Sequence, residues 1–176
     1  MSGNAHYALN LERGWLEAKN MGRMVAVPEA VLASLVQVAV QSGDLTAMRI
    51  AGKSLADFVA GRAEGSLPEK PWDKVLAEAR LALGLSGLGA LEAERWGRAL
   101  TLVVRGAPAL DDDQLGTAAL LGGLFSSLAS TDVACVPVDD GRFLCLDPSV
   151  AEAVWNWSKA GRSLFSILTE MESVVA

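Results

Sequence analysis

Residues 116–146 read GTAALLGGLFSSLASTDVACVPVDDGRFLCL, and this stretch changes its structural period halfway. The first part carries small and apolar residues and no charge as far as Thr131, which is typical of a buried helix. The second part holds two short apolar runs, Val133–Val138 and Arg142–Leu146, on either side of Asp139-Asp140-Gly141. An Asp-Gly pair between two such runs is a strong hairpin signal. The stretch therefore predicts a buried helix that is followed directly by an antiparallel hairpin.

Upstream of this stretch, the sequence predicts three helices and a second hairpin. Pro28 suits the first turn of a helix, and Val31, Leu35 and Val38 follow at helical spacing. Ser42-Gly43-Asp44 then ends this helix and caps the next one, expected over residues 45–63. A third helix is expected from Pro71 onward, after a linker over residues 65–71.

The glycines at 84, 87 and 89 end the third helix, and two strands are expected after them. These strands cover Leu88–Glu94 and Arg98–Arg105, with a turn at 95–97. Asp111, Asp112 and Asp113 then open the buried helix, where carboxylates complement the helix dipole. The element order predicts an α+β fold, with grouped helices packed on a small antiparallel sheet built from two hairpins.

The chain divides into three parts of one compact protein of 176 residues. Residues 1–27 form an N-terminal extension, in which 1–24 are compatible with strands, with a short helix or with packing in an oligomer. Residues 28–147 form the α+β domain. Residues 148–176 form a C-terminal helical extension of the same domain, begun by Asp147-Pro148.

The composition of the chain argues against a nucleic-acid partner and against a membrane span. The net charge is −6, and the 15 lysines and arginines are scattered, so a nucleic-acid partner is not expected. The first 20 residues lack the apolar core of a signal peptide, and the chain has only two cysteines, which favours a cytoplasmic protein. The uncharged residues 114–131 contain several hydroxyl and amide side chains, so no membrane span is expected.

A nucleotide-binding alternative rests on residues 47–54, AMRIAGKS, which match a relaxed phosphate-loop pattern that ends in Lys53 and Ser54. Such a loop follows a strand, but here the apolar residues continue a helical stripe through the motif. A solvated Lys53 on a helix is therefore the preferred interpretation. The alternative is a nucleotide-binding protein that uses Lys53.

Catalytic groups are scarce in this sequence. His6 is the only histidine, which argues against a histidine-activated nucleophile and against a histidine-rich zinc site. We therefore expect no enzyme, no metal and no cofactor. Cys135 and Cys145 are symmetric about the hairpin turn, with 138 expected opposite 142. They are interpreted as small core residues, as the lining of a ligand pocket, or as a redox pair or lipid attachment site.

Apolar residues make up 51% of the chain, so it has either a very full core or an apolar surface kept for a partner. Trp96 falls in an expected turn, and Trp155 and Trp157 point to different faces of one helix. Amphipathic aromatic residues concentrate at interfaces. These three tryptophans are the expected interface residues.

Four segments resemble the 4-vinyl reductase domain family, which is related to the small core subunits of vesicle-tethering (TRAPP) complexes. They are AMRIAGKSLADFVAGR (47–62), GLSGLGALEAERWGRALTLVV (84–104), GTAALLGGLFSSLA (116–129) and VACVPVDDGRFLCL (133–146). With the helix at Pro28, the resemblance covers about residues 28–147. It implies a bacterial or archaeal α+β domain that commonly dimerises through helices, with an internal apolar pocket.

Two functions follow from these expectations. The first is a non-catalytic module that homodimerises or docks on a protein partner, as a scaffold for a signalling or GTPase-linked system. The second is a sensor of a small hydrophobic ligand. Gly122 and Gly123 would let such a ligand approach the buried helix closely, with Phe125, Cys135 and Cys145 beside it.

Overall fold

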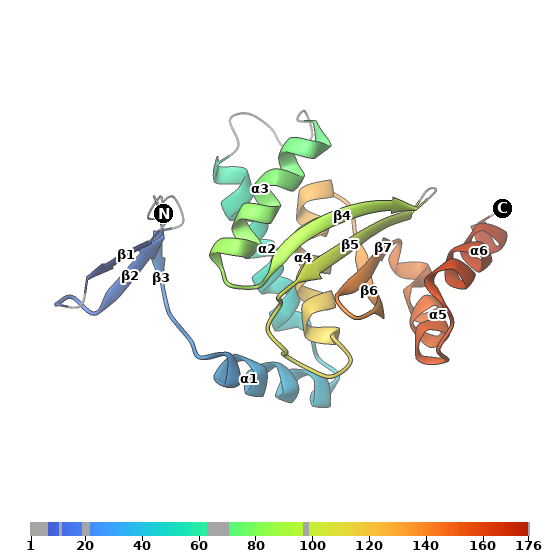
Figure 1. Ribbon diagram of the computed structural model, residues 1–176, viewed down its shortest axis with the longest axis horizontal. Coiled ribbons are helices and arrows are strands. Elements are labelled where there is room, and N and C mark those ends of the chain that lie inside the picture. The colour runs from blue at the N-terminus through green and yellow to red at the C-terminus, as the bar shows by residue number, and fades with distance from the viewer. Residues whose placement is uncertain (1–6, 11, 19–21, 63–70, 97–98, 176) are drawn as a thin grey trace.

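The protein has an α+β fold. The computed structural model describes residues 7–10, 12–18, 22–62, 71–96 and 99–175, shown in colour in Figure 1. In this part of the chain, six helices accompany a three-stranded and a four-stranded antiparallel sheet. Most of the expected 65–71 linker, Gly97 of the expected turn, and His6 lie outside the described residues.

The helices are α1 (Glu29–Ser42), α2 (Thr46–Arg62), α3 (Trp72–Leu85), α4 (Leu115–Ala129), α5 (Pro148–Lys159) and α6 (Leu164–Val175). The strands are β1 (Tyr7–Asn10), β2 (Trp15–Ala18), β3 (Gly22–Met24), β4 (Ala90–Trp96), β5 (Ala99–Arg105), β6 (Ala134–Asp139) and β7 (Arg142–Leu146). The helix and hairpin expected from residues 116–146 are confirmed as α4, β6 and β7.

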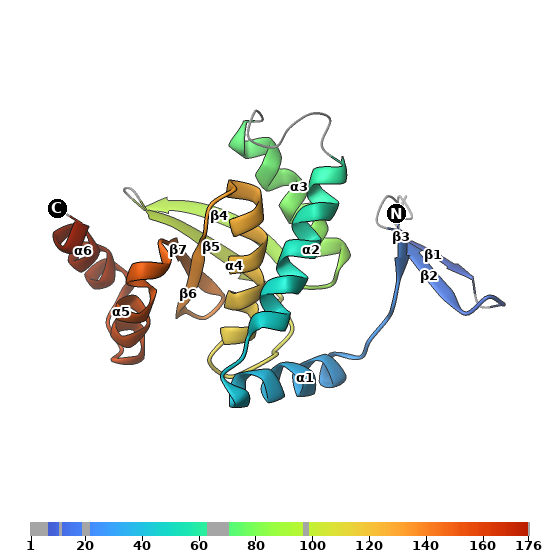
Figure 2. The same cartoon turned by 180° about the vertical axis from the view of Figure 1, so that it is seen from behind.

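The four-stranded sheet has the order β4-β5-β7-β6, so the two hairpins join through β5 and β7. On one face, α4 lies against the sheet and α2 lies beside α4 (Figure 2). The second face packs through Val136 and Leu144 on Val154 of α5 and Ile167 of α6. The four residues 101–104 of β5 are buried, as expected for a strand that is covered on both sides.

Short polar residues set the helix ends as the sequence predicts. Gly43 ends α1 with a φ of 72°, a left-handed conformation that glycine adopts without strain. The Asp44 carboxylate accepts a hydrogen bond from the backbone N–H of Thr46 at 2.9 Å. Hydrogen bonding from the side chain of Thr46 and from this backbone N–H lowers the pKa of Asp44. Asp147 caps α5 in the same way, through the N–H of Ser149 at 2.8 Å.

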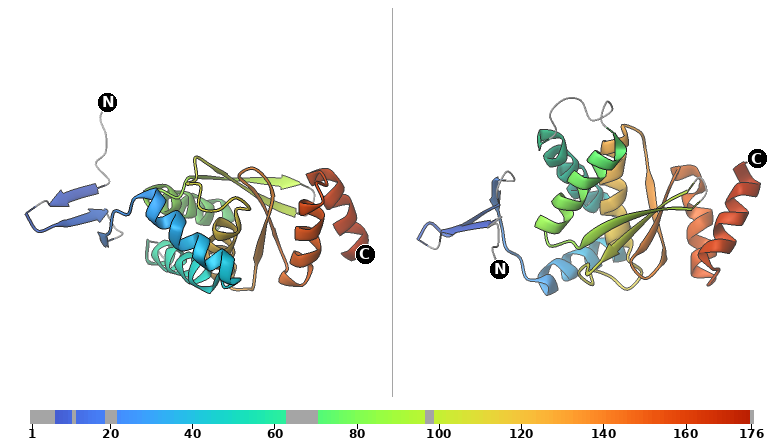
Figure 3. Two further views of the ribbon diagram at one scale, coloured as in Figure 1. Left: turned by 90° about the horizontal axis from the view of Figure 1, so that it is seen from below. Right: turned by 45° about the horizontal axis from the view of Figure 1, so that its top comes forward.

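The described residues between Tyr7 and Met24 form strands, where the sequence left a short helix open as well. Strands β1, β2 and β3 make a small antiparallel meander that an extended segment joins to α1 (Figure 1). The Tyr7 hydroxyl donates a hydrogen bond to the Leu85 carbonyl oxygen at the end of α3. The meander lies at the opposite end of the molecule from α5 and α6 (Figure 3).

Glycines allow α2 and α4 to cross in backbone contact. A Cβ atom on Gly52 would overlap the carbonyl oxygen of Leu120 and lie 2.7 Å from the N atom of Leu124. A Cβ atom on Gly123 would overlap the carbonyl oxygen of Arg49. Any larger residue at either position would push the two helices apart, so these glycines set the distance between them.

Only one of the three consecutive aspartates caps α4. The Asp111 carboxylate accepts hydrogen bonds from the N–H groups of Leu115 at 2.6 Å and Gly116 at 3.0 Å. Asp113 instead pairs with Lys159 of α5 at 2.8 Å. The three carboxylates precede α4 as expected, but Asp111 and Asp113 have different partners.

This geometry gives a first testable prediction. Replacing Asp111 with alanine should lower the free energy of unfolding by about 1–2 kcal/mol, because two N–H groups lose their acceptor. Asp112 has an exposed side chain, so Asp112→Ala is the matched control and should change stability little. Urea unfolding followed by circular dichroism measures both variants. Equal losses for the two would show that the Asp111 cap adds nothing.

Two details of the hairpins differ from expectation. Trp96 is the last residue of β4 and not a turn residue. In the second hairpin, Cys135 pairs with Cys145 as expected, but Arg142 pairs with Asp139 and not with Val138. The register shifts between Pro137 and Asp139, where Pro137 has no N–H to donate to the ladder.

Candidate functional site

Helix α1 carries an exposed apolar surface. Val31, Leu35 and Val38 are 49%, 64% and 66% exposed, respectively. Their spacing of four and then three residues is the spacing of the core positions of a coiled coil, so the three side chains follow one line along the helix. We call this set of three residues the α1 stripe.

The same helix also has a buried apolar side. Val36 is almost fully buried in a cluster with Met48 of α2, Leu110, and Ala119 and Leu120 of α4. Leu32 and Val40 pack against this cluster. The spacing of Val31, Leu35 and Val38 thus predicted the helix, and the structure places these three residues on its exposed side. Helix α1 is apolar on two sides, and the described chain covers only one of them.

Helix α1 has one charged residue, which lies at its start, before the α1 stripe. Glu29 is the only charged residue of α1, and its carboxylate accepts a hydrogen bond from the N–H of Ala109 at 2.9 Å. Val25 and Val27, in the segment that leads into α1, are exposed as well. The exposed apolar surface therefore extends beyond the first turn of the helix. Larger surfaces of this kind mark interaction sites in soluble proteins.

The three tryptophans expected at an interface occupy different environments. Trp96 is 44% exposed at the end of β4, and its indole N–H donates to the Glu94 carboxylate at 3.2 Å. Trp155 and Trp157 are half-buried and pack against the cluster between the sheet, α5 and α6. Trp155 and Trp157, which were expected at an interface, thus make much of their contact within the chain.

Cations also cover the rings of the two half-buried tryptophans. The Lys159 Nζ lies 5.4 Å from the ring centre of Trp155, and the Arg162 guanidinium lies 5.6 Å from that of Trp157. Such contacts stabilise a cation over an aromatic face. They leave less of each ring available to a partner than the sequence suggested.

Cys135 and Cys145 are brought together by the hairpin. They face each other across β6 and β7, and their Sγ atoms are 3.4 Å apart with both thiols free. Cys135 is buried in the main core, while Cys145 is half-buried and packs against that core. The hydrogen bond with Cys145 and burial raise the pKa of the Cys135 thiol well above its ordinary value.

The other residues expected to bind a ligand are packed within the protein. A Cβ atom on Gly122 would lie 3.2 Å from the Arg49 guanidinium and 3.3 Å from the Val133 carbonyl oxygen. At Gly123 the space is taken by the backbone of α2. The expectation that these glycines admit a ligand is therefore corrected, because they admit α2 and the start of β6. Phe125 is buried, with its ring centre 6.0 Å from that of Trp72.

Arg49 of α2 binds residues at the connection between α4 and β6. Its guanidinium pairs with Asp132 at 2.8 Å and donates to the Ser126 hydroxyl at 3.3 Å. Ser126 in turn accepts from the N–H of Val133 at 2.9 Å. These bonds fix the connection between α4 and β6 and so hold Cys135 in place. Arg49 also opposes the rise in the pKa of Cys135, because its positive charge favours the thiolate.

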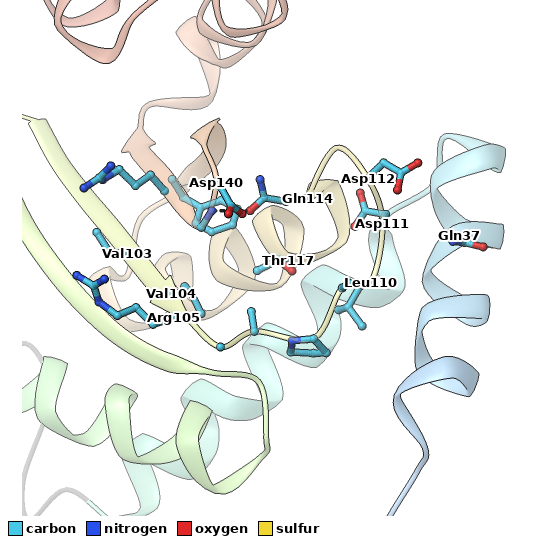
Figure 4. A pocket seen from close by; sticks show the side chains of 17 residues that line it. Gln37, Val103, Val104, Arg105, Leu110, Asp111, Asp112, Gln114, Thr117 and Asp140 are labelled. Carbon is cyan, nitrogen blue, oxygen red and sulfur yellow. Dashed lines mark hydrogen bonds between the residues drawn. The ribbon is translucent and has the colours of Figure 1, made fainter.

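A surface cavity of about 580 Å³ lies between β5, the loop before α4 and the turn of the second hairpin. Gln114 lies at this cavity, and its amide oxygen accepts from the N–H of Gly141 at 2.9 Å (Figure 4). Both arginines of the lining are ion-paired, Arg105 with Glu92 and Arg142 with Asp139. The lining includes charged and amide side chains, unlike the apolar pocket that the family resemblance implies; they are Gln37, Arg105, Asp111, Asp112, Gln114, Asp140 and Arg142.

Three other features considered in the sequence are a phosphate-binding loop, a metal site and a membrane span. Residues 47–54 lie entirely within α2, and Lys53 is exposed on that helix, so this segment does not form a phosphate-binding loop. Within the described ranges, no group of three or more metal-ligating side chains comes together. None of the helices described is both long and apolar enough to cross a membrane.

Comparison with known proteins adds no relative to these observations. No family model matches the sequence, and no curated protein is significantly similar to it. The exposed surface of α1 and the cysteine pair are the features of the described residues that point to a function.

Proposed function

We propose that the protein is a non-catalytic assembly module that forms a homodimer through the α1 stripe. The observation that carries this proposal is the two-sided apolar character of α1, in which Val36 lies in the core and Leu35 lies in solvent. A helix that is apolar all round is normally buried all round. In this proposal, a second copy of the chain covers the outer side.

The α1 stripe suits a second copy because it is complementary to itself. In a two-fold arrangement with antiparallel helices, Leu35 meets Leu35 of the other copy near the axis, and Val31 meets Val38. The side chains at positions 34, 37 and 41 are uncharged, so the pairing brings no like charges of α1 together. Apolar side chains at alternating spacings of three and four residues pack well against the same pattern on another helix.

The size of the surface suggests a dimer of moderate affinity. A helix of 14 residues is roughly 21 Å long, so one helix pair covers less than the ~800 Å² per partner of a typical stable interface. Val25 and Val27 extend the apolar surface. We therefore expect the dimer to dissociate on dilution.

We further propose that the protein is related to 4-vinyl reductase domains, in which dimerisation through helices is common. In this proposal the homodimer is a cytoplasmic scaffold for a signalling or GTPase-linked system, and its remaining surface binds a protein partner. Exposed Trp96 is the member of the expected tryptophan set that best suits such a second contact.

A charge on the α1 stripe tests the proposal. Leu35→Glu should convert the dimer into a monomer, because two carboxylates would meet at the axis in an apolar contact. The fold should be retained, since Leu35 is 64% exposed and glutamate is a good helix former. Sedimentation velocity measures the mass of each variant. Leu9→Glu is the matched control, a leucine 65% exposed on β1, and should leave the dimer intact.

A second variant separates self-association from misfolding. Leu35→Lys alone should also be monomeric, but an equal mixture of the Glu and Lys variants should form a heterodimer, because the charges at the axis are then opposite. If the mixture stays monomeric while the wild type is dimeric, the two-fold contact does not pass through Leu35. A Leu35→Glu chain that dimerises like the wild type contradicts the proposed interface.

A further inference from the structure

The two cysteines have the geometry that a disulfide requires. Residues directly opposite each other on antiparallel strands have Cα atoms about 4.5–5.5 Å apart, which falls within the range for disulfides of about 4.4–6.8 Å. Cys135 and Cys145 are such a pair, and their Sγ atoms are already 3.4 Å apart. Rotation of the two side chains can close the bond without moving either strand.

The two thiols differ in access. Cys145 is half-buried on β7, whereas Cys135 is buried between β6 and α4. A small thiol reagent from solvent therefore reaches Cys145 first. Cys135 lies opposite it on β6 with its Sγ atom 3.4 Å away, in position to react with whatever forms on the Cys145 sulfur.

We propose that Cys135 and Cys145 form a reversible dithiol–disulfide site that exchanges with low-molecular-weight disulfides. Cys145 is the residue that reacts with the incoming disulfide, and Cys135 is the resolving residue. This site is independent of the α1 stripe and of the proposed dimer. Both reacting sulfurs belong to the second hairpin, where Cys135 and Cys145 are partners in the backbone ladder.

The reaction balances in two exchange steps. The Cys145 thiol loses its proton, and the thiolate attacks one sulfur of the small disulfide, whose S–S bond breaks. One small thiolate is released and takes up a proton from solvent in place of the one that Cys145 gave up, which leaves a mixed disulfide on Cys145. The Cys135 sulfur then loses its proton and attacks the Cys145 sulfur. The mixed disulfide breaks, and the second small thiolate leaves and takes up the proton. Two cysteine thiols are oxidised, and one small disulfide is reduced to two thiols.

Burial and the positive charge of Arg49 act in opposite directions on Cys135 in the second step. The pKa of the Cys135 thiol is raised by its hydrogen bond with Cys145 and by burial, while Arg49 favours its thiolate. Once Cys145 is part of a mixed disulfide it no longer has a thiol proton to share. Burial then still raises the pKa of Cys135, and Arg49 still opposes that rise.

Glutathione disulfide is the probe for the test. The folded full-length protein is incubated with it, quenched with acid, unfolded and labelled with a maleimide, and intact masses are measured. The wild type should end as single chains, not linked to each other by a disulfide, that are lighter by two hydrogens and take up no maleimide; dithiothreitol should restore two labelled thiols. Peptide mapping should find Cys135 joined to Cys145.

Single-cysteine variants identify the roles of the two residues. Cys135→Ser should stop at one glutathione on Cys145, and Cys145→Ser should remain unmodified over the time in which the wild type reacts completely. The proposal is overturned if the wild type keeps both thiols, holds glutathione without closing the internal bond, or links two chains. Because the wild type alone decides this, a variant that folds poorly does not weaken the test.

Discussion

Replacing Gly52 with alanine should lower the free energy of unfolding by about 3 kcal/mol or more, because the new methyl group would overlap backbone atoms of α4. Backbone cannot rotate aside as a flexible side chain can, so α2 and α4 must separate. Separation also loosens the packing of α4 against the sheet. Urea unfolding of the variant and the wild type, with the same probe, measures the loss.

Gly61 provides the matched control within the same helix. A Cβ atom at Gly61 meets nothing within 4 Å, so Gly61→Ala should change stability by less than about 1 kcal/mol, and in the favourable direction because alanine is the better helix former. Gly123→Ala should resemble Gly52→Ala, since its Cβ would overlap the backbone of Arg49. If Gly52→Ala is as stable as Gly61→Ala, the close helix crossing is not the protein's structure.

Oxidation of the cysteine pair should raise the free energy of unfolding by about 2–3 kcal/mol, the value expected for closing a short loop in the unfolded chain. The loop is short because the two cysteines are 10 positions apart. We expect most of this gain to be realised, since the folded hairpin already places the two cysteines opposite each other with their Sγ atoms 3.4 Å apart.

The measurement compares urea midpoints of the disulfide form and of the same protein kept in reductant. Cys145→Ser should show one midpoint under both conditions, which controls for effects of the reagents on the rest of the protein. A disulfide form that unfolds at the same urea concentration as the dithiol form, or earlier, would mean that the bond strains β6 and β7.

Much of the fold could be predicted because local signals coincide with its element ends. Gly43 with Asp44, and Asp147 with Pro148, end or begin helices through backbone conformation and capping bonds that depend on few neighbours. The Asp140-Gly141 turn likewise fixed the second hairpin and placed Cys135 opposite Cys145. Such features depend on residues close together in sequence.

The parts that could not be predicted depend on which neighbour fills a space. Gly122 and Gly123 indicated a close approach to α4, but the sequence does not say whether a ligand or α2 makes it. Trp155 and Trp157 suggested an interface because they point in different directions on α5. Helix α6 and the sheet cover much of both rings, and this arrangement depends on distant segments.

The α1 stripe was visible in the sequence, but its position relative to the core was not. Val31, Leu35 and Val38 gave the helical spacing, yet Leu32, Val36 and Val40 provide a second apolar line on the same helix. A helix with two apolar sides does not reveal from its own residues which side faces the core. Contacts from α2 and α4 decide this, and they select the side that carries Val36.

The most direct test of the proposed homodimer is sedimentation velocity of the purified wild-type chain over a dilution series. At micromolar concentrations we expect a species of twice the chain mass of 18.4 kDa, which gives way to the monomer as the protein is diluted. A single species of 18.4 kDa at every concentration would contradict the account, because the α1 stripe would then remain uncovered in solution.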